Sequence, residues 1–388
     1  MTDGTILSMA APALAPAVRT WMFDRALPFW LEHGLDRTHG GAVESLNLDG
    51  SPLNEPFKRT RVICRQIYVF SHASLLGAPD AAATADRLCD HLLERVWKGD
   101  EAGWPRTTTR ETAEALDSTP DLYDYAFVLF ALAWRYKAAS DPRALKLAHR
   151  TLDLVETRFR HPAGGFHHQL PPGLPRQQNP HMHLTEAALA LAEASGDERF
   201  GALADELVGL FRSRFLRAGG VLPEFYDDDL RAVAGEAGRR VEPGHQFEWS
   251  WILAQHQKRT GADNESLIRD LVACAERHGV DQATQVTFNA VRDDGTPVDR
   301  GSRTWPNTER MKGWIALEEL TGTPAGAAVT GSARLLLDRY LGGDAIPGAW
   351  IDAFDADGAP AASTIPASTL YHVFLAFAEL LRRTTPAG

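Results

Sequence analysis

The stretch PGHQFEWSWILAQHQKR, residues 243–259, predicts a helix that begins at or just before His245 and is apolar over most of its length. Pro243 and Gly244 end whatever segment precedes it. His245 and Glu248 are three residues apart, so they share one face of its first turn. The positive end of a helix lowers the pKa of a histidine and favours its neutral form. His245 is therefore a candidate general base, with Glu248 as the carboxylate that fixes its tautomer. A helix-capping histidine beside a surface glutamate is the alternative.

Five other segments share this apolar composition, which is rich in aromatic residues and alanine and predicts helices buried on most sides. The six cover residues 59–76, 121–137, 182–195, 245–259, 308–320 and 368–382. Six more segments have apolar residues three and four positions apart with charges between them, as in helices with one wet face. These cover residues 18–32, 81–96, 142–159, 199–215, 265–278 and 325–340. The two kinds of helix alternate along the chain.

A glycine-rich segment precedes each buried helix and reads as a short hairpin or extended loop. These segments cover residues 39–50, 101–109, 163–171, 219–229, 287–297 and 346–358. Steps of 62, 62 and 55 residues separate Gly41, Gly103, Gly165 and Gly220. Six inner and six outer helices in alternation predict an all-α fold, an (α/α)6 barrel with its hairpins on one rim, and one domain over residues 1–388. An open α-solenoid is the rival, but its repeats are usually shorter than about 50 residues and it needs polar capping repeats.

The composition predicts a soluble cytoplasmic protein that is a monomer or a homodimer. A formal charge of −11 and a pI near 5.7 argue against nucleic acid or an anionic membrane as the main partner, although a local basic pocket is compatible with them. Three scattered cysteines do not make a disulfide framework and fit a reducing compartment. The first residues have no positive charge ahead of an apolar run, so they make a poor signal peptide, and the longest apolar run, residues 125–134, is too short to span a membrane.

The barrel brings the starts of all six inner helices to one rim, so the polar residues there should converge on one pocket. We expect it to contain Arg61, Arg65, Tyr123, Asp124, His181, His183, His245, Glu248, Arg303, Trp305, Glu309, Tyr371 and His372. Such a set suits a polyhydroxy ligand, because carboxylates and arginines bind hydroxyl pairs and an indole covers a sugar's C–H face. Its mixed charge argues against a dedicated phosphate site. A metal site of His181, His183, His245 and Glu248 is an alternative.

Several of these motifs together resemble one known family. The order RQIYVFS, LYDYAF, NPHMHLTEA, PGHQFEWSW, RTWPNTER and STLYHVF, spanning residues 59–374, is similar to the N-acylglucosamine 2-epimerase superfamily. The resemblance implies an (α/α)6 barrel and proton transfer on an open-chain sugar without a metal or other cofactor. By match to the family's motifs, it implies catalytic roles for His245, Glu248 and His372 and substrate binding by Arg65, His183, Trp305 and Glu309. The RTWPNTER form looks like mannose isomerases, whereas disaccharide epimerases tend to have consecutive tryptophans here.

The expected reaction is the interconversion of D-mannose and D-fructose, with D-lyxose and D-xylulose as a further pair, through a cis-enediol. His372 would move the proton between C2 and C1, while His245, oriented by Glu248, would open the ring and serve O1 and O2. Arg65 would stabilise the enediolate and His183 would bind a hydroxyl or the ring oxygen. Tyr123, Asp124, Arg61 and Arg303 complete the expected substrate-binding set.

Four alternatives remain at this point. The nearest is a sugar 2-epimerase on the same fold. An inverting glycoside hydrolase would use two of Asp124, Glu248 and Glu309 as its carboxylates. A metal-dependent isomerase and a non-catalytic sugar-binding protein are the others.

Overall fold

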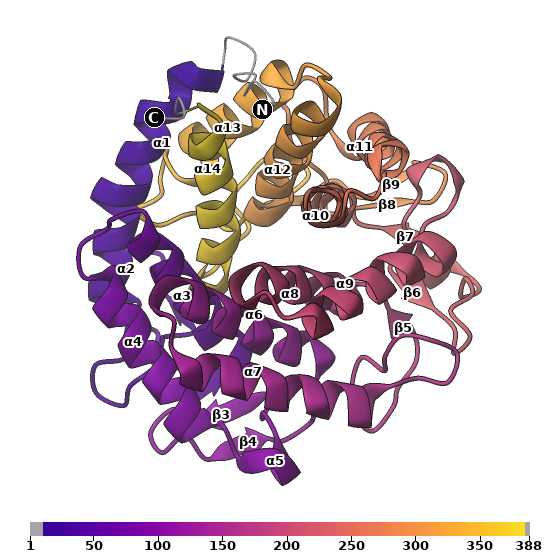
Figure 1. Ribbon diagram of the computed structural model, residues 1–388. Helices are drawn as coiled ribbons and strands as arrows, with labels where there is room; N and C mark the ends of the chain where they lie inside the picture. The colour runs from indigo at the N-terminus through magenta and orange to yellow at the C-terminus, as the bar shows by residue number, and fades with distance from the viewer. Residues whose placement is uncertain (1–10, 385–388) are drawn as a thin grey trace.

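The computed structural model describes residues 11–384 as two concentric rings of helices (Figure 1). The inner ring consists of α3 (Thr60–Leu75), α6 (Leu122–Ala139), α8 (Asn179–Ser195), α10 (Pro243–Thr260), α12 (Thr304–Thr321) and α14 (Leu370–Thr384). Each inner helix packs against the next one along the chain, and α14 packs against α3. The ring is therefore closed, as the (α/α)6 prediction requires and an open solenoid does not allow.

One outer segment precedes each inner helix in the chain, and the outer segments cover the inner ring from outside (Figure 1). They are α1 (Ala15–Thr20) with η2 (Trp21–Ala26) and α2 (Leu27–His33), α4 (Ala81–His91) with η3 (Leu92–Val96), α7 (Pro142–Leu154) with η4 (Val155–Phe159), α9 (Glu198–Leu210) with η5 (Phe211–Phe215), α11 (Glu265–Gly279), and α13 (Gly326–Leu335) with η8 (Leu336–Tyr340). Four of them end in a five-residue π-helical turn, η3, η4, η5 and η8, at equivalent points. This recurrence marks the repeat that the glycine spacing predicted.

The inner and outer helices differ in how many of their sides are buried, as their sequence patterns predicted. In α7 the buried positions include Ala144, Leu147, Ala148 and Thr151, which are three or four residues apart and form one stripe. In α6 every residue from 124 to 133 is buried, because α3 and α8 flank it and α7 covers it from outside. The core formed by these contacts is continuous around the ring among the described residues.

Short antiparallel strands connect neighbouring repeats at the rim where the inner helices begin. The pairs are β2 (Phe57–Arg59) with β3 (Thr107–Thr109), β5 (Arg176–Gln177) with β6 (Phe225–Tyr226), β7 (Arg240–Val241) with β8 (Ala290–Arg292), β10 (Ser302–Arg303) with β11 (Ala353–Phe354), and β1 (Ser45–Leu46) with β12 (Ile365–Pro366). The last pair joins the first repeat to the last. Local hairpins add β4 (Ala115–Asp117) to β3 and β9 (Pro297–Asp299) to β8.

Two inner helices begin earlier than their sequences suggested. Helix α8 starts at Asn179 instead of residue 182, and α12 starts at Thr304 instead of residue 308. Pro180 and Pro306 fall in these first turns, where a missing N–H removes no intrahelical hydrogen bond. Trp305 therefore lies on the helix and not in the loop before it. No helix within residues 11–384 has the length and apolar character that a membrane crossing needs.

Candidate active site

A cavity of about 440 Å³ opens at the rim where the inner helices begin. Eight of the predicted residues line it: Arg65, Tyr123, His183, His245, Glu248, Arg303, Trp305 and His372. They come from all six inner helices or the residues just before them, which is the convergence that the topology predicted. Arg61, Asp124 and Glu309 do not line this cavity.

His245 is buried at the start of α10 and is held by a carboxylate that the sequence analysis did not single out. Its Nδ1 lies 2.9 Å from Oε1 of Glu224, which comes from the loop before β6. The Gln178 amide donates to the other Glu224 oxygen at 3.0 Å, and Trp249 Nε1 fixes that amide by donating to its oxygen at 2.7 Å. Glu224, and not Glu248, therefore orients His245.

The charge of His245 also differs from the expectation. Burial on its own lowers the pKa of this histidine, but the adjacent Glu224 carboxylate outweighs burial and raises the pKa to about 9. The imidazolium then donates from Nδ1 to Glu224 and keeps Nε2–H for the cavity. At neutral pH His245 is a proton donor, and the helix dipole that we expected to keep it neutral is the weaker influence.

His372, in the first turn of α14, has the opposite protonation state. Burial, together with the positive charges of Arg65 and Lys312, holds its pKa well below the ordinary range. Its Nδ1 donates to Glu309 Oε1 at 2.8 Å, which leaves Nε2 as an unprotonated acceptor. His372 is therefore suited to act as a general base.

The two histidines lie in the same cavity and both pack beside the indole of Trp305. The ring centroid of Trp305 lies 5.0 Å from that of His245 and 5.7 Å from that of His372. Gly244 makes this packing possible, since a Cβ at that position would lie 2.4 Å from Trp305 Cζ3. A proton donor and a proton acceptor thus flank one aromatic surface.

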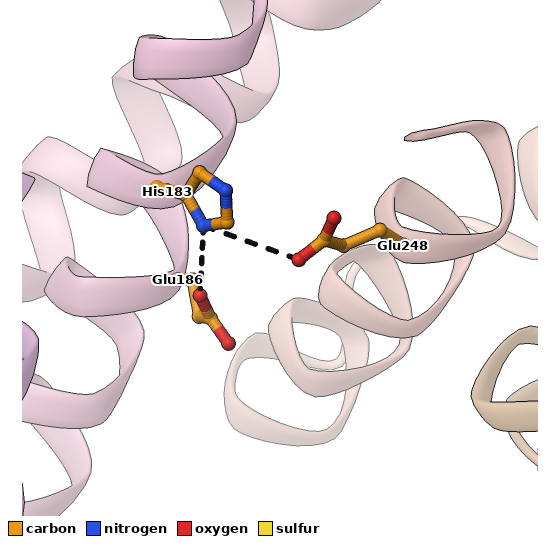
Figure 2. A group of neighbouring side chains, drawn as sticks. All are labelled: His183, Glu186 and Glu248. Atoms are coloured by element: carbon orange, nitrogen blue, oxygen red, sulfur yellow. Dashed lines mark hydrogen bonds and ion pairs between the residues drawn. The ribbon is translucent and has the colours of Figure 1, made fainter. Parts of the chain in front are cut away.

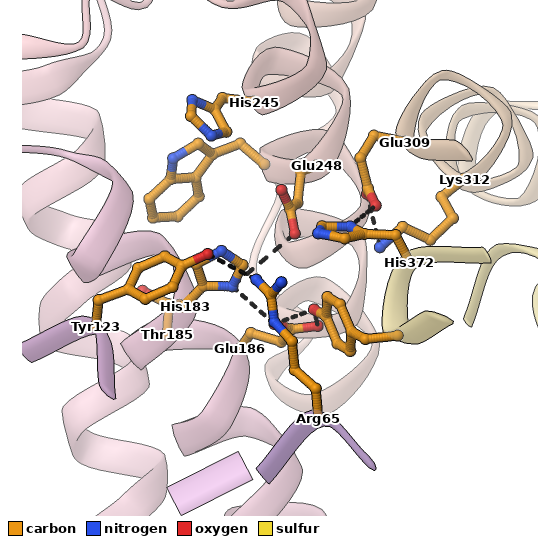
Figure 3. A network of polar contacts seen from close by, with 12 residues as sticks. Arg65, Tyr123, His183, Thr185, Glu186, His245, Glu248, Glu309, Lys312 and His372 are labelled. Atoms are coloured by element: carbon orange, nitrogen blue, oxygen red, sulfur yellow. Dashed lines mark hydrogen bonds and ion pairs between the residues drawn. The ribbon is translucent and has the colours of Figure 1, made fainter. Parts of the chain in front are cut away.

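A fully buried ion pair supports His372 from behind. Lys312 Nζ lies 2.7 Å from Glu309 Oε2, and neither side chain is exposed to solvent (Figure 3). Burial alone lowers the pKa of Lys312, but the adjacent Glu309 carboxylate outweighs burial and raises the pKa, so the ammonium stays charged. Glu309 therefore acts through His372 and does not contact the substrate as the resemblance implied.

Glu248 is buried in the cavity wall, and its two carboxyl oxygens have no hydrogen-bond partner in the described part of the chain. Burial and the neighbouring Glu309 carboxylate raise its pKa well above the ordinary value. Burial also raises the pKa of Glu309, but the adjacent Lys312 ammonium opposes this, so of the two neighbouring carboxyls Glu248 is the one that holds a proton more readily. A protonated Glu248 can donate a hydrogen bond to a ligand in the cavity.

His183 lines the cavity, and Glu186 lies one turn further along α8 (Figure 2). Its Nδ1 lies 3.2 Å from Glu186 Oε2 and 3.9 Å from Glu248 Oε1. Tyr371 donates its hydroxyl to Glu186 at 2.7 Å, so this carboxylate is shared between two inner helices. Burial lowers the pKa of His183 although Glu186 opposes this, so the imidazole is neutral and its Nε2 can accept a hydrogen bond.

Arg65 supplies the positive charge on the opposite wall. It donates to the Tyr123 hydroxyl at 2.7 Å and to the Ser368 carbonyl at 3.2 Å, and its guanidinium lies 4.3 Å from the centre of the Phe127 ring. No carboxylate in residues 11–384 forms an ion pair with it. Its charge is therefore available to a ligand oxygen.

The remaining predicted residues lie at the edge of the cavity or beneath it. Arg303 lies at the entrance, 5.3 Å from the Trp305 ring centre. Asp124 is buried, with its Oδ1 3.7 Å from Arg61 Nε, so it supports Arg61 and does not face the ligand as we expected. Arg61 itself lines a second cavity that adjoins the first.

The predicted metal-ligand set is not brought together. The Nε2 atom of His181 accepts from the Phe166 backbone N–H at 3.0 Å and its Nδ1 donates to the Gln177 carbonyl at 2.9 Å, so this histidine is fully used inside the protein. Two other groups, His183 with Glu186 and Glu248, and Glu248 with Glu309 and His372, have potential ligand atoms within 4.8 Å of one another among the described residues. The Lys312 ammonium lies 2.7 Å from Glu309 Oε2, so a cation in the second group would compete with it.

Three functional residues were not predicted from the sequence: Glu186, Lys312 and Glu224. Glu186 follows His183 by three residues, the same spacing as His245 and Glu248, and Lys312 follows Glu309 by three. Charged residues at this spacing in otherwise apolar helices are a signal that could have found both. Glu224 has no local signal, since it meets His245 from a different element.

Comparisons with known proteins identify the family of the chain. The family model for N-acylglucosamine 2-epimerase matches residues 41–376. The mannose-6-phosphate isomerase of Rhizobium meliloti (strain 1021) is 36% identical over 371 residues, covering 93% of this chain and 95% of that protein. The D-mannose isomerase of Thermobifida fusca is 28% identical over 301 residues, covering 71% and 72%.

Solved structures share the fold. The cellobiose 2-epimerase of Spirochaeta thermophila superposes with a TM-score of 0.85 at 23% identity, covering 98% of both chains. A family 76 α-mannanase of Bacteroides thetaiotaomicron gives a TM-score of 0.68 at 12% identity, covering 96% of this chain and 98% of that one. Barrels of this kind therefore serve both isomerising and hydrolysing enzymes, and the side chains must decide between them.

Proposed function

Because the chain belongs to the N-acylglucosamine 2-epimerase family, we propose that it is an aldose–ketose isomerase that interconverts D-mannose and D-fructose, and D-lyxose and D-xylulose, without a metal. One relative named D-mannose isomerase and one named mannose-6-phosphate isomerase support a mannose-type substrate. The observation that carries the proposal is the pair of histidines at Trp305, whose environments move their pKa values in opposite directions. Such a pair assigns an acid and a base to one site.

The proposed reaction begins with an open-chain aldose whose C2 faces Nε2 of His372. This nitrogen takes the C2 proton while His245 gives its Nε2 proton to O1, which produces the neutral cis-enediol. His245, now neutral, then takes the proton from O2, and His372, whose proton exchanges with solvent, delivers a proton to C1. The ketose forms and both histidines regain their starting states.

The neighbouring groups stabilise the charge that develops on the oxygens. Arg65 has no carboxylate partner and can donate to an enediolate oxygen, which contributes on the order of 3 kcal/mol for one such donor. The protonated carboxyl of Glu248 and the neutral imidazole of His183 offer a donor and an acceptor to the sugar hydroxyls. Trp305 offers its face to the C–H side of the carbon chain.

A 2-epimerase is the second candidate, and the charge of His245 is the observation that favours it. A protonated His245 can deliver a proton to the other face of C2 as well as to an oxygen. A glycoside hydrolase has less support, because of its three predicted carboxylates only Glu248 lines the cavity, while Asp124 and Glu309 lie behind other residues.

The proposal is tested by incubating the protein with D-mannose, D-lyxose, D-glucose and cellobiose, with and without a chelator, and identifying the products. We expect D-fructose from D-mannose and D-xylulose from D-lyxose, at rates that the chelator does not change. Glucose from mannose would make the protein an epimerase, and cleavage of cellobiose would make it a hydrolase. Loss of activity with the chelator would overturn the metal-free mechanism.

A further inference from the structure

A second cavity of about 510 Å³ adjoins the first and has a different charge. The two share part of their walls, including Arg65 and Tyr123. The first cavity is bordered by four acidic residues, which are Glu224, Glu242, Glu248 and Asp352. The second has four arginines, Arg59, Arg61, Arg65 and Arg106, together with His168, and Asp121 is its one acidic lining residue within residues 11–384. Arginines therefore outnumber acidic residues in the second cavity, whereas the first combines its four acidic residues with Arg59, Arg65 and Arg303.

Two adjacent repeats build this arginine cavity. Arg59 ends β2, and Arg61 and Arg65 lie in the first two turns of α3, one turn apart on the same side. Strand β3 pairs with β2 so that Arg59 lies opposite Thr107, which places the preceding residue, Arg106, at the same edge. The guanidinium carbons of Arg61 and Arg65 lie 5.4 and 5.8 Å from the centre of the Tyr123 ring, so both border one aromatic surface.

The positive charge of this cavity is only partly compensated. Arg59 pairs with Glu44 at 2.6 Å and Arg106 with Asp121 at 2.9 Å. Arg65 has no carboxylate partner in the described part of the chain.

The nearest carboxylate to Arg61 is Asp124, at 3.7 Å, which is too far for a hydrogen bond. Burial raises the pKa of Asp124 to about 7, although Arg61 opposes this, so the carboxyl is about half protonated near neutral pH. Arg61 therefore keeps donors and charge for a ligand in this cavity, whereas Arg65, which the two cavities share, is the guanidinium proposed for the enediolate.

We infer that the arginine cavity binds a phosphate group at the far end of the sugar, so that the preferred substrate is a hexose 6-phosphate. The inference rests on the proposed function, because a hexose with C1 and C2 at His372 has C6 at the opposite end of its carbon chain. A phosphate monoester carries a charge of about −1.5 to −2 at pH 7 and three acceptor oxygens, and guanidinium groups match it with paired donors. A neutral second sugar would instead need aromatic faces, and Tyr123 and His168 are the only rings among the described lining residues. The name of the Rhizobium meliloti relative points the same way.

The test compares the dissociation constants of D-mannose, D-mannose 6-phosphate and inorganic phosphate by calorimetry, together with kcat/KM for the two sugars. The variants are Arg61→Gln and Arg106→Gln, and the matched control is Arg87→Gln on the exposed side of α4. The wild type should bind the sugar phosphate at least about 10-fold more tightly than mannose. Each cavity variant should reduce that preference by roughly 10-fold or more, while the control keeps it. The ratio of the values for the two sugars cancels any loss of affinity or activity that affects both equally. Either cavity variant is sufficient if the other fails to fold.

Equal affinity of the wild type for mannose and its 6-phosphate would overturn the inference and leave the isomerase proposal standing. Tighter binding of the sugar phosphate without turnover of either sugar would support the phosphate site and overturn the proposed function. Binding of inorganic phosphate without any preference for the sugar phosphate would mean that the arginines take a free anion, which also overturns the inference. A preference that both cavity variants retain would place the phosphate elsewhere and overturn it as well.

Discussion

At the scale of single residues, the site depends on which carboxylate faces which histidine. Glu224 keeps His245 protonated, whereas the ionised Glu309 fixes the tautomer of a neutral His372. The same kind of contact gives two results, because Lys312 neutralises Glu309 and nothing comparable neutralises Glu224 among the described residues. Whether each histidine acts as the acid or the base therefore depends on whether a cation neutralises the carboxylate that it contacts.

Replacing Glu224 by glutamine should remove the charge that holds the proton on His245. The pKa of His245 should fall from about 9 toward the ordinary value near 6.5, because burial is then opposed only by the smaller contributions of Glu242 and Glu248. A protonated His245 is the active form, so wild-type kcat/KM should decline as pH rises through about 9, and in Glu224→Gln the decline should begin at least about one pH unit lower. Glu236→Gln, which removes an exposed carboxylate paired with Arg292, is the matched control and should leave the profile unchanged. An alkaline limb at the same pH in Glu224→Gln and the wild type would refute the assignment of His245 as the acid.

At the scale of elements, the start of each inner helix positions the chemistry. Helix α10 approaches α12 closely at Gly244, and that contact fixes the indole that both histidines touch. The sequence predicted that these helices begin at one rim, because the hairpin pattern recurs before each of them. It misplaced the start of α12 by four residues, because a proline in the first turn looks like a residue in a loop.

The substitution Gly244→Ala should displace Trp305, since the added Cβ would lie 2.4 Å from its ring and 3.2 Å from the Pro306 backbone. A shift of about 1 Å in a substrate-positioning group can lower the rate by about 100-fold, so kcat/KM should fall by that order while circular dichroism shows an intact helical fold. Gly209→Ala is the matched control, because Gly209 is also helical but has open space around it. It should leave activity unchanged and raise the free energy of unfolding by about 0.5–1 kcal/mol. Normal activity in Gly244→Ala would mean that the position of Trp305 does not matter.

The sequence reveals contacts within a helix more readily than contacts between elements. The spacing of His245 and Glu248 suggested that they pair with each other. In the structure His245 instead pairs with Glu224, 21 residues away, and His372 pairs with Glu309, 63 residues away. Which distant carboxylate meets a histidine depends on the rotation of each helix in the ring, and spacing alone does not specify it. The set of residues at the rim could be predicted as a group, because it depends only on where each inner helix begins and not on how each helix is rotated.

At the scale of the whole molecule, the ring is closed by contacts between the beginning and the end of the chain. Strand β1 pairs with β12, and Gln66 on α3 donates to the Ala367 carbonyl at 2.8 Å. Arg65 and His372, on opposite sides of this junction, line the same cavity. The site therefore needs residues from both the first and the last repeat of the ring.

The prediction of one domain over the chain can be tested by unfolding. The core is continuous around the ring and the closing contacts join the first repeat to the last, so the repeats should unfold together. Differential scanning calorimetry should show one transition in which the calorimetric and van't Hoff enthalpies agree. Two resolved transitions, or a van't Hoff enthalpy well below the calorimetric one, would show that the chain contains separate folding units.

The most direct measurement of the central claim is proton transfer itself, followed by NMR in deuterated water. D-mannose and D-mannose 6-phosphate are incubated with the wild type and with His372→Ala, whose fold is checked by circular dichroism. The account predicts that the wild type forms a ketose carrying deuterium at C1, and that His372→Ala forms almost none because the base between C2 and C1 is missing. Deuterated ketose formed by His372→Ala at the wild-type rate, or no exchange at C1 or C2 of either sugar with the wild type, would contradict it.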